Sequence, residues 1–155
     1  MLKINLIAVG KVKEKYFSDG IEEYRKRLKK YCDFSIIEVP EENYNKPTAA
    51  ETVKIKETEA DGIIPKLKGK VYSLAIEGDK IGSERFADII KKVADGGDTL
   101  TFVVGGSYGL SDRVKKLSAP ISFGDITLPH TLFRLVLTEQ IYRAFTIING
   151  TPYHK

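Results

Sequence analysis

Short apolar segments alternate with amphipathic segments along the whole chain, and this alternation limits the possible folds more than any other feature. Apolar strands separated by amphipathic helices are typical of a mostly parallel sheet with helices on both faces. The sequence therefore predicts a single α/β domain that spans residues 1–155. The predicted strands are Leu2–Val9, Phe34–Val39, Val71–Ile76, Leu100–Val104 and Ile121–Leu128.

The segments between the predicted strands carry the signals of helices. After the first strand, apolar residues recur at steps of three and four, which is the period of one helical face. These residues are Phe17, Ile21, Tyr24, Leu28 and Tyr31. Thr48 and Glu51 form a capping box at the start of a second helix, and Ser83 and Ser111 are the predicted N-caps of two more.

The last predicted helix, His130–Asn149, is apolar on nearly every side. Such a helix has to be buried on most of its surface, so we expect it to pack on its own sheet and on a second subunit. The chain continues into Tyr153, His154 and Lys155. We expect these reactive side chains to lie at the edge of an interface, which favours a functional role for them.

Composition and charge narrow the class of protein. No apolar run reaches the roughly 18 residues of a membrane-spanning helix, and the first segment resembles a strand more than a signal peptide. We therefore expect a cytoplasmic protein without membrane association. Cys32 is the only cysteine, which disfavours a disulfide framework or a cysteine metal cluster and predicts a small core residue.

The net charge of +4 is concentrated near the N-terminus. Residues 1–31 hold nine Lys or Arg and four Asp or Glu, so the rest of the chain is close to neutral. A basic surface on an otherwise balanced protein favours a polyanionic partner such as nucleic acid. The alternative is an ordinary solvated helix that is rich in lysine.

A glycine cluster, Gly105, Gly106 and Gly109, follows the fourth predicted strand. In open α/β sheets, ligands bind beyond the carboxyl ends of strands, where glycine lets the backbone approach them closely. The spacing is neither a dinucleotide fingerprint nor a P-loop, which disfavours NAD(P) and nucleoside triphosphates. Leu74–Gly78 and Phe123–Pro129 end two further strands similarly. Together the three ends predict a pocket for an adenine-bearing ligand, whereas the glycine cluster alone is compatible with a tight turn.

His130 and His154 are the only histidines, and neither has a metal-ligand spacing. A structural capping role is predicted for His130, and a functional role for His154 remains open beside it. Glu139 and Arg143, four residues apart on the last helix, either pair with each other or leave Arg143 free to hold a phosphate or a base. No catalytic triad, H-E-x-x-H motif or close carboxylate pair is present, which disfavours hydrolysis by a triad or a metal.

Three segments, Phe102–Ser111, Leu128–His130 and Glu139–Lys155, closely resemble the RlmH-type (YbeA-like) SPOUT methyltransferases. The opening segment and the length also match, so the resemblance covers essentially the whole chain. It implies an α/β knot, in which the C-terminal segment is threaded through a loop to form a trefoil. It also implies an obligate homodimer that binds S-adenosylmethionine in the knot.

The implied reaction is methylation at N3 of a pseudouridine in large-subunit (23S) ribosomal RNA, with assembled ribosomes as the substrate and no metal. Two alternatives stay open: a SPOUT enzyme for another rRNA or tRNA site, and a catalytically silent RNA-binding module. Some relatives place an arginine after the final histidine, where this chain has Lys155. A lysine at this position can still meet a phosphate as a point charge.

The resemblance also assigns roles to individual residues. The implied cofactor-binding residues are Leu74, Gly105, Gly106, Phe123, Gly124, Asp125, Ile126, Thr127 and Leu128. The implied catalytic or substrate-binding residues are Arg143, Tyr153 and His154, supported by Glu139 and His130. We expect His154 to act as a base or an orienting group and Arg143 to stabilise developing charge, both across the dimer interface. The basic side chains predicted to grip RNA are Arg25, Lys26, Lys29, Lys30 and Lys155.

Overall fold

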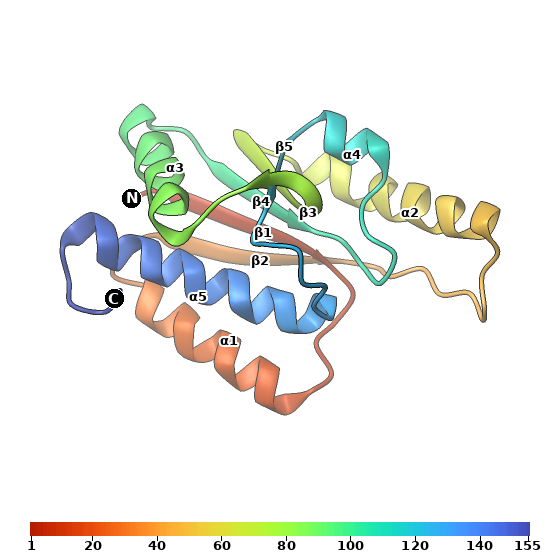
Figure 1. Ribbon diagram of the computed structural model, residues 1–155, viewed down its shortest axis with the longest axis horizontal. Coiled ribbons are helices and arrows are strands. Elements are labelled where there is room, and N and C mark those ends of the chain that lie inside the picture. The colour runs from red at the N-terminus through yellow and green to blue at the C-terminus, as the bar shows by residue number, and fades with distance from the viewer.

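Five strands form one sheet in the computed structural model, which describes residues 1–155 (Figure 1). In chain order the strands are β1 (Lys3–Val9), β2 (Asp33–Val39), β3 (Lys70–Lys80), β4 (Leu100–Val104) and β5 (Ala119–Ser122). Their order across the sheet is β2-β1-β4-β3-β5, and every neighbouring pair is parallel. The prediction of a parallel α/β sheet is confirmed.

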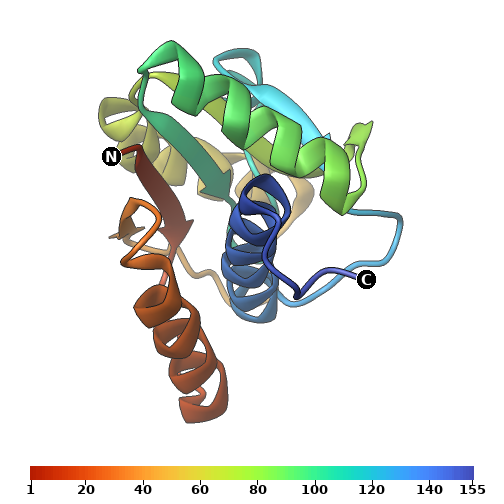
Figure 2. The ribbon, with the colours of Figure 1, turned by 90° about the vertical axis from the view of Figure 1, so that its left-hand side faces the viewer.

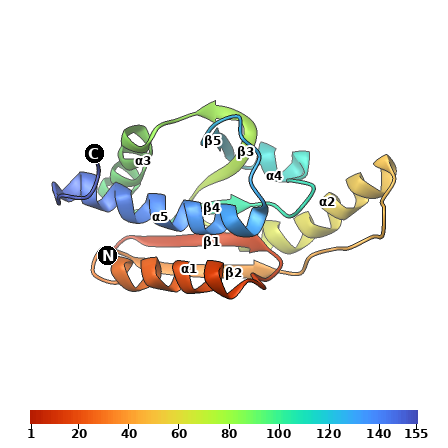
Figure 3. The same cartoon turned by 60° about the horizontal axis from the view of Figure 1, so that its bottom comes forward.

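Five helices and one short 3₁₀ turn connect the strands. They are α1 (Lys15–Leu28), α2 (Ala49–Ile63), η1 (Ile64–Lys66), α3 (Ser83–Gly96), α4 (Asp112–Lys116) and α5 (His130–Asn149). Helix α5 contacts both α1 and α3 on one face of the sheet, and α2 contacts α4 on the other (Figures 1 and 3). Helices therefore cover both faces, as the alternating pattern predicts. None of these helices combines the length and apolar composition that a membrane span requires.

The interior strand β1, between β2 and β4, shows why the sheet is buried on both faces. Ile4 and Leu6 belong to the core cluster beneath α1, α3 and α5, whereas Ile7 and Val9 belong to the cluster beneath α2 and α4. Successive side chains of a strand point to opposite faces, so a strand covered on both sides is apolar throughout. Cys32 lies in the first cluster, and burial raises the pKa of its thiol to about 12, which confirms a core role.

Helix α5 begins and ends where the sequence predicts. Only Asn149 among its residues is largely exposed, so α5 is covered or half-covered along its whole length. Its largest buried polar side chain is Arg134, which donates to Glu38 Oε2 at 2.6 Å and to the backbone oxygen of Gly10 at 3.1 Å. After Gly150 ends the helix in a left-handed conformation, the chain turns back along α5 (Figure 2).

Two predicted helix caps are present and one is wrong. Thr48 and Glu51 form the reciprocal capping box, and the Ser111 hydroxyl accepts from the backbone N–H of Val114. Ser83, however, is the first helical residue of α3 and caps nothing. Its hydroxyl donates instead to Oε1 of Gln140 on α5 at 2.7 Å, so it joins two helices.

The end of the third strand and the fifth strand differ from their predicted bounds. Strand β5 stops at Ser122, because Gly124 turns with a φ of +136° and its N–H donates to the Ser122 hydroxyl at 3.1 Å. The segment up to Leu128 is therefore a loop rather than a strand. Strand β3 does not close at Gly78 but runs on to Lys80 and pairs with β5 again after a shift in register.

Candidate active site

Residues 74–77 of β3, at the end of its pairing with β4, and the carboxyl ends of β4 and β5 surround a cavity of about 630 Å³. All nine residues predicted to bind a cofactor line this one cavity, so the structure brings together three segments that are far apart in the sequence. They are Leu74, Gly105, Gly106, Phe123, Gly124, Asp125, Ile126, Thr127 and Leu128. The volume lies within the range of small-molecule sites, and about half of the lining residues are hydrophobic.

Glycine is required in the wall of this cavity because backbone segments meet there. A Cβ atom on Gly105 would lie 2.7 Å from the backbone carbon of Gly109, which no ordinary packing permits. A Cβ atom on Gly106 would lie 3.1 Å from Val9 and 3.2 Å from a carboxylate oxygen of Glu59. The turn 105–109 is thus folded tightly against β1 and α2, and it presents backbone rather than side chains to the cavity.

The charged residues that line the cavity are mostly neutralised by partners. Asp125 lies 2.7 Å from Nζ of Lys80, and Glu77 pairs with Lys115, whose hydrogen bond holds the pKa of the Glu77 carboxyl below its usual range. A cavity with paired charges suits a ligand that has no triphosphate to neutralise. Three large apolar side chains of the lining are exposed, and these are Ile76, Tyr108 and Ile126.

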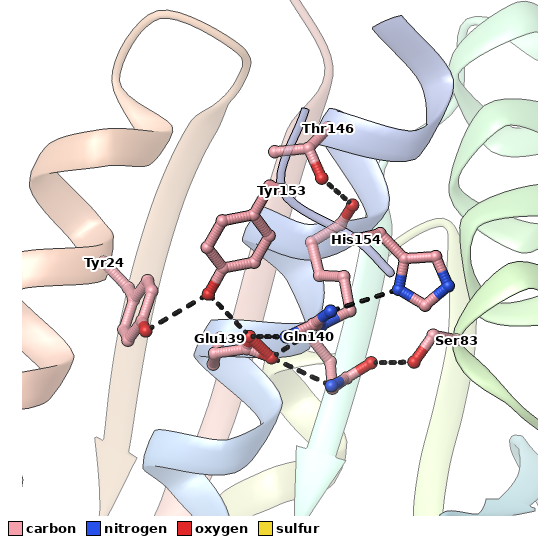
Figure 4. Close-up of polar contacts among 8 residues, drawn as sticks. Tyr24, Ser83, Glu139, Gln140, Thr146, Tyr153 and His154 are labelled. Atoms are coloured by element: carbon pink, nitrogen blue, oxygen red, sulfur yellow. Dashed lines mark hydrogen bonds and ion pairs between the residues drawn. The ribbon is translucent and has the colours of Figure 1, made fainter. Parts of the chain in front are cut away.

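The four predicted catalytic residues form a second site, the C-terminal polar cluster (Figure 4). The Glu139 carboxylate accepts from Nε and Nη2 of Arg143 at 3.2 and 3.3 Å. It also accepts from the Tyr153 hydroxyl at 3.1 Å. Nη1 of Arg143 lies 3.1 Å from Nδ1 of His154, and the guanidinium lies 4.8 Å from the centre of the Tyr153 ring. Of the two interpretations of Arg143, the structure shows the pair with Glu139, and the role of holding a phosphate or a base stays a prediction.

Three further residues complete this cluster, and the sequence predicts a site role for none of them: Tyr24 belongs to a predicted helical face, Ser83 is a predicted N-cap, and Gln140 has no predicted role. The Tyr24 hydroxyl of α1 lies 3.3 Å from the Tyr153 hydroxyl, and Gln140 donates to Glu139 at 2.9 Å. Ser83 of α3 in turn holds Gln140 (Figure 4). Side chains from α1, α3 and α5 therefore fix the returning tail in place.

Protonation states in the cluster follow from its contacts. The hydrogen bonds that Arg143 donates to Glu139 raise the pKa of Arg143 above its already high ordinary value, so the guanidinium is a permanent cation. Burial and the hydrogen bond to Tyr24 raise the pKa of Tyr153, which therefore remains a neutral phenol. Because a guanidinium can only donate, Nδ1 of His154 accepts from it, which leaves the ring proton on Nε2.

The cavity and the C-terminal polar cluster lie on different parts of α5. His130, Phe133 and Val136 of its first turns line the cavity, whereas none of the four cluster residues does. The predicted capping role of His130 is wrong: α5 has no side-chain cap at Pro129, and the His130 ring lies instead 3.8 Å from the Glu41 carboxylate.

The residues predicted to contact RNA sit on and beside the second half of α1 and on the tail. Lys26, Lys29 and Lys30 are exposed there, and Arg25 is half-buried and pairs with Glu22 at 3.2 Å. Lys155 is exposed two residues beyond Tyr153, which touches α1 through Tyr24. The tail is therefore held against the helix that carries the basic surface. No group of three or more His, Cys, Asp or Glu side chains is placed to share a metal ion.

Comparison with known proteins decides the family. The family model described as "Predicted SPOUT methyltransferase" matches residues 2–154. The chain belongs to this family. A relative from Limosilactobacillus reuteri (strain DSM 20016), named "Ribosomal RNA large subunit methyltransferase H", is 54% identical and is matched over its full length and 99% of this chain. A relative of the same name from Streptococcus uberis is 51% identical with the same coverage.

Solved structures give the same fold at low sequence identity. TrmJ from Z. mobilis ZM4 superposes with a TM-score of 0.54 at 9% identity, covering 99% of this SPOUT methyltransferase and 83% of TrmJ. A putative methylase family protein from Neisseria gonorrhoeae gives a TM-score of 0.50 at 10% identity, with 99% and 96% covered. These structures support the α/β architecture, and membership of a methyltransferase family implies that the chain uses a methyl donor.

Proposed function

We propose that this SPOUT methyltransferase transfers a methyl group from S-adenosylmethionine to N3 of a pseudouridine in 23S rRNA of assembled ribosomes in the cytoplasm. The observation that carries the proposal is the convergence of three strand ends on one cavity whose charges are mostly paired. The names of the full-length relatives support large-subunit rRNA as the substrate class.

The cavity fits S-adenosylmethionine in size and chemistry. Backbone at Gly105 and Gly106 and the loop of residues 123–128 would hold it, and the apolar lining suits an adenosyl group. When bound, it supplies an activated methyl group on a sulfonium. The residues of the protein then have to position the target base and favour loss of its N3 proton.

In this proposal the N3 proton passes to solvent water, the methyl group passes from the sulfonium to N3, and Arg143 stabilises the negative charge that develops on the uracil ring as the proton leaves. Glu139 fixes the guanidinium through two hydrogen bonds, so little reorganisation is needed during the reaction. His154 is better placed to orient than to accept the proton, because Arg143 already occupies the Nδ1 lone pair. Its Nε2 lies 3.9 Å from the exposed Glu84 carboxylate, too far for a hydrogen bond, so in this proposal the Nε2–H donates to a carbonyl oxygen of the base.

A homodimer would bring the C-terminal polar cluster of one protomer to the cavity of the other. Mixed dimers test this arrangement: Gly105→Val disables the cavity, and His154→Ala disables the tail. We expect each variant alone to be inactive and a refolded mixture to recover activity, because a mixed dimer contains one intact cavity and one intact tail at the same site. A mixture as inactive as its components would contradict the shared site.

The proposed reaction is tested by incubating ribosomes lacking the modification with labelled S-adenosylmethionine and the protein, followed by mass spectrometry of the rRNA. Isolated 23S rRNA, large subunits and tRNA serve as competing substrates. Arg143→Ala and His154→Ala should reduce transfer by about 100-fold or more, the usual size for charge stabilisation in a transition state. Lys91→Ala, which breaks only an exposed pair with Asp95 on α3, is the matched control. Near wild-type transfer by both cluster variants would refute their assignment.

A further inference from the structure

The segment between β2 and α2 reaches the wall of the cavity through one side chain, Glu41. Its Oε1 accepts from the Ser107 hydroxyl at 3.3 Å and lies 3.8 Å from Nε2 of His130. A Cβ atom placed on Gly10 would lie 2.9 Å from Oε2 of Glu41, so Glu41 is packed against the end of β1. One carboxylate thus lies beside the glycine turn, the start of α5 and the residue that follows β1.

The backbone beside Glu41 is fixed by a second carboxylate. The N–H of Glu42 donates to Oε2 of Glu59 at 3.1 Å, and Glu59 is 4% exposed on the inner side of α2. The Glu59 carboxylate also lies beside Gly106, because a Cβ atom placed on Gly106 would lie 3.2 Å from one of its oxygens. The β2–α2 segment and the glycine turn are therefore anchored to the same buried side chain, which limits how far either can move without the other.

We propose that Glu41 is a positioning residue for the donor cavity, holding the turn 105–109 against the first turn of α5. This inference rests on the proposed binding of S-adenosylmethionine in that cavity. The turn supplies Gly105, Gly106 and Tyr108 to the lining, and α5 supplies His130. Glu41 itself does not line the cavity, so it acts through Ser107 and His130 rather than by touching the ligand.

The test is the affinity for S-adenosylmethionine, measured by titration calorimetry on the full chain. Glu41→Ala should raise the Kd about tenfold, the size expected from losing one hydrogen bond to a charged group. Glu41→Gln keeps an acceptor for Ser107 and should recover most of that loss. Glu42→Ala is the matched control, because it removes a neighbouring carboxylate and keeps the backbone N–H that binds Glu59. Its Kd should stay within about twofold of wild type.

A double-mutant cycle separates positioning from a general loss of stability. Because Ser107 and Glu41 act through the same contact, Ser107→Ala in the Glu41→Ala background should cost little further affinity. Amide hydrogen exchange at residues 105–110 should be faster in Glu41→Ala than in Glu42→Ala, while the urea midpoints of the two variants stay similar. Additive losses, or equal losses in Glu41→Ala and Glu42→Ala, would overturn the proposal. A wild-type protein that does not bind S-adenosylmethionine would refute the proposed function instead.

Discussion

Glu59→Gln should remove a pH dependence that the buried carboxyl imposes on the stability of the fold. Burial, followed by the nearby Glu41 and Glu42 carboxylates, raises the pKa of Glu59 from 4.5 to about 7, against the opposing hydrogen bond from the Glu42 N–H. The folded state therefore binds a proton more tightly than the unfolded state. The contribution of Glu59 to the free energy of unfolding is fully present below pH 4.5 and is lost as the pH rises through 7. Since a tenfold change in proton affinity is worth about 1.4 kcal/mol, the total loss is roughly 3 kcal/mol.

Glutamine has nearly the same shape, cannot ionise and still accepts from the Glu42 N–H. The free energy of unfolding is measured by urea denaturation, followed by circular dichroism, between pH 4.5 and 8 at one protein concentration. Other groups titrate equally in both proteins, so the difference between Glu59→Gln and wild type isolates Glu59. We expect that difference to grow by roughly 3 kcal/mol in favour of the variant across the range, a large part of a typical domain stability. A difference that does not change with pH would show that Glu59 titrates alike in both states, which would refute the reasoning.

Three other perturbations test the fold and the basic surface. Thr48→Ala removes the hydroxyl of the capping box and should lower the free energy of unfolding by about 1 kcal/mol, measured by urea denaturation. Arg134→Ala leaves the backbone acceptor at Gly10 without its partner inside the protein and should cost roughly 3 kcal/mol in the same assay. Lys26→Ala with Lys29→Ala should weaken ribosome binding and flatten its dependence on salt, measured by filter binding from low to physiological ionic strength. An unchanged salt slope would place the RNA elsewhere.

Local patterns were enough to predict most of the architecture. The bounds of α5 follow from a helical apolar segment between Pro129 and Gly150, and Thr48 with Glu51 marks the start of α2. The cavity was also predictable, because parallel strands end at one edge of the sheet and three of those ends carry small or turn residues. These features depend on residues close in sequence or on a general property of parallel sheets. The trefoil threading that the resemblance implies stays a prediction.

Features that depend on distant partners were missed or misread. Ile126 and Leu128 are two residues apart, a spacing typical of one face of a strand, yet residues 123–128 line a cavity instead of pairing with a strand, and Ile126 is 82% exposed. The contact between Tyr24 and Tyr153 joins positions 129 residues apart, and no local signal connects them. Serine is a preferred N-cap residue, but the Ser83 hydroxyl donates instead to Gln140 on α5, a helix that packs beside α3. Tertiary contacts decided each of these cases against the local preference.

The geometry of α5 links the two sites and gives the proposed dimer its strongest physical support. A helix rises about 1.5 Å per residue, so Val136 at the cavity and Arg143 in the C-terminal polar cluster are separated by roughly 10 Å along the axis. For Arg143 to stabilise charge on the target base, its guanidinium has to reach that base, whose N3 has to approach the methyl group to about 3–3.5 Å. Within one chain, Arg143 is also turned toward Glu139 and the returning tail rather than toward its own cavity. A second copy that places its cluster over the exposed apolar rim at Ile126 would close this gap without unpacking α5.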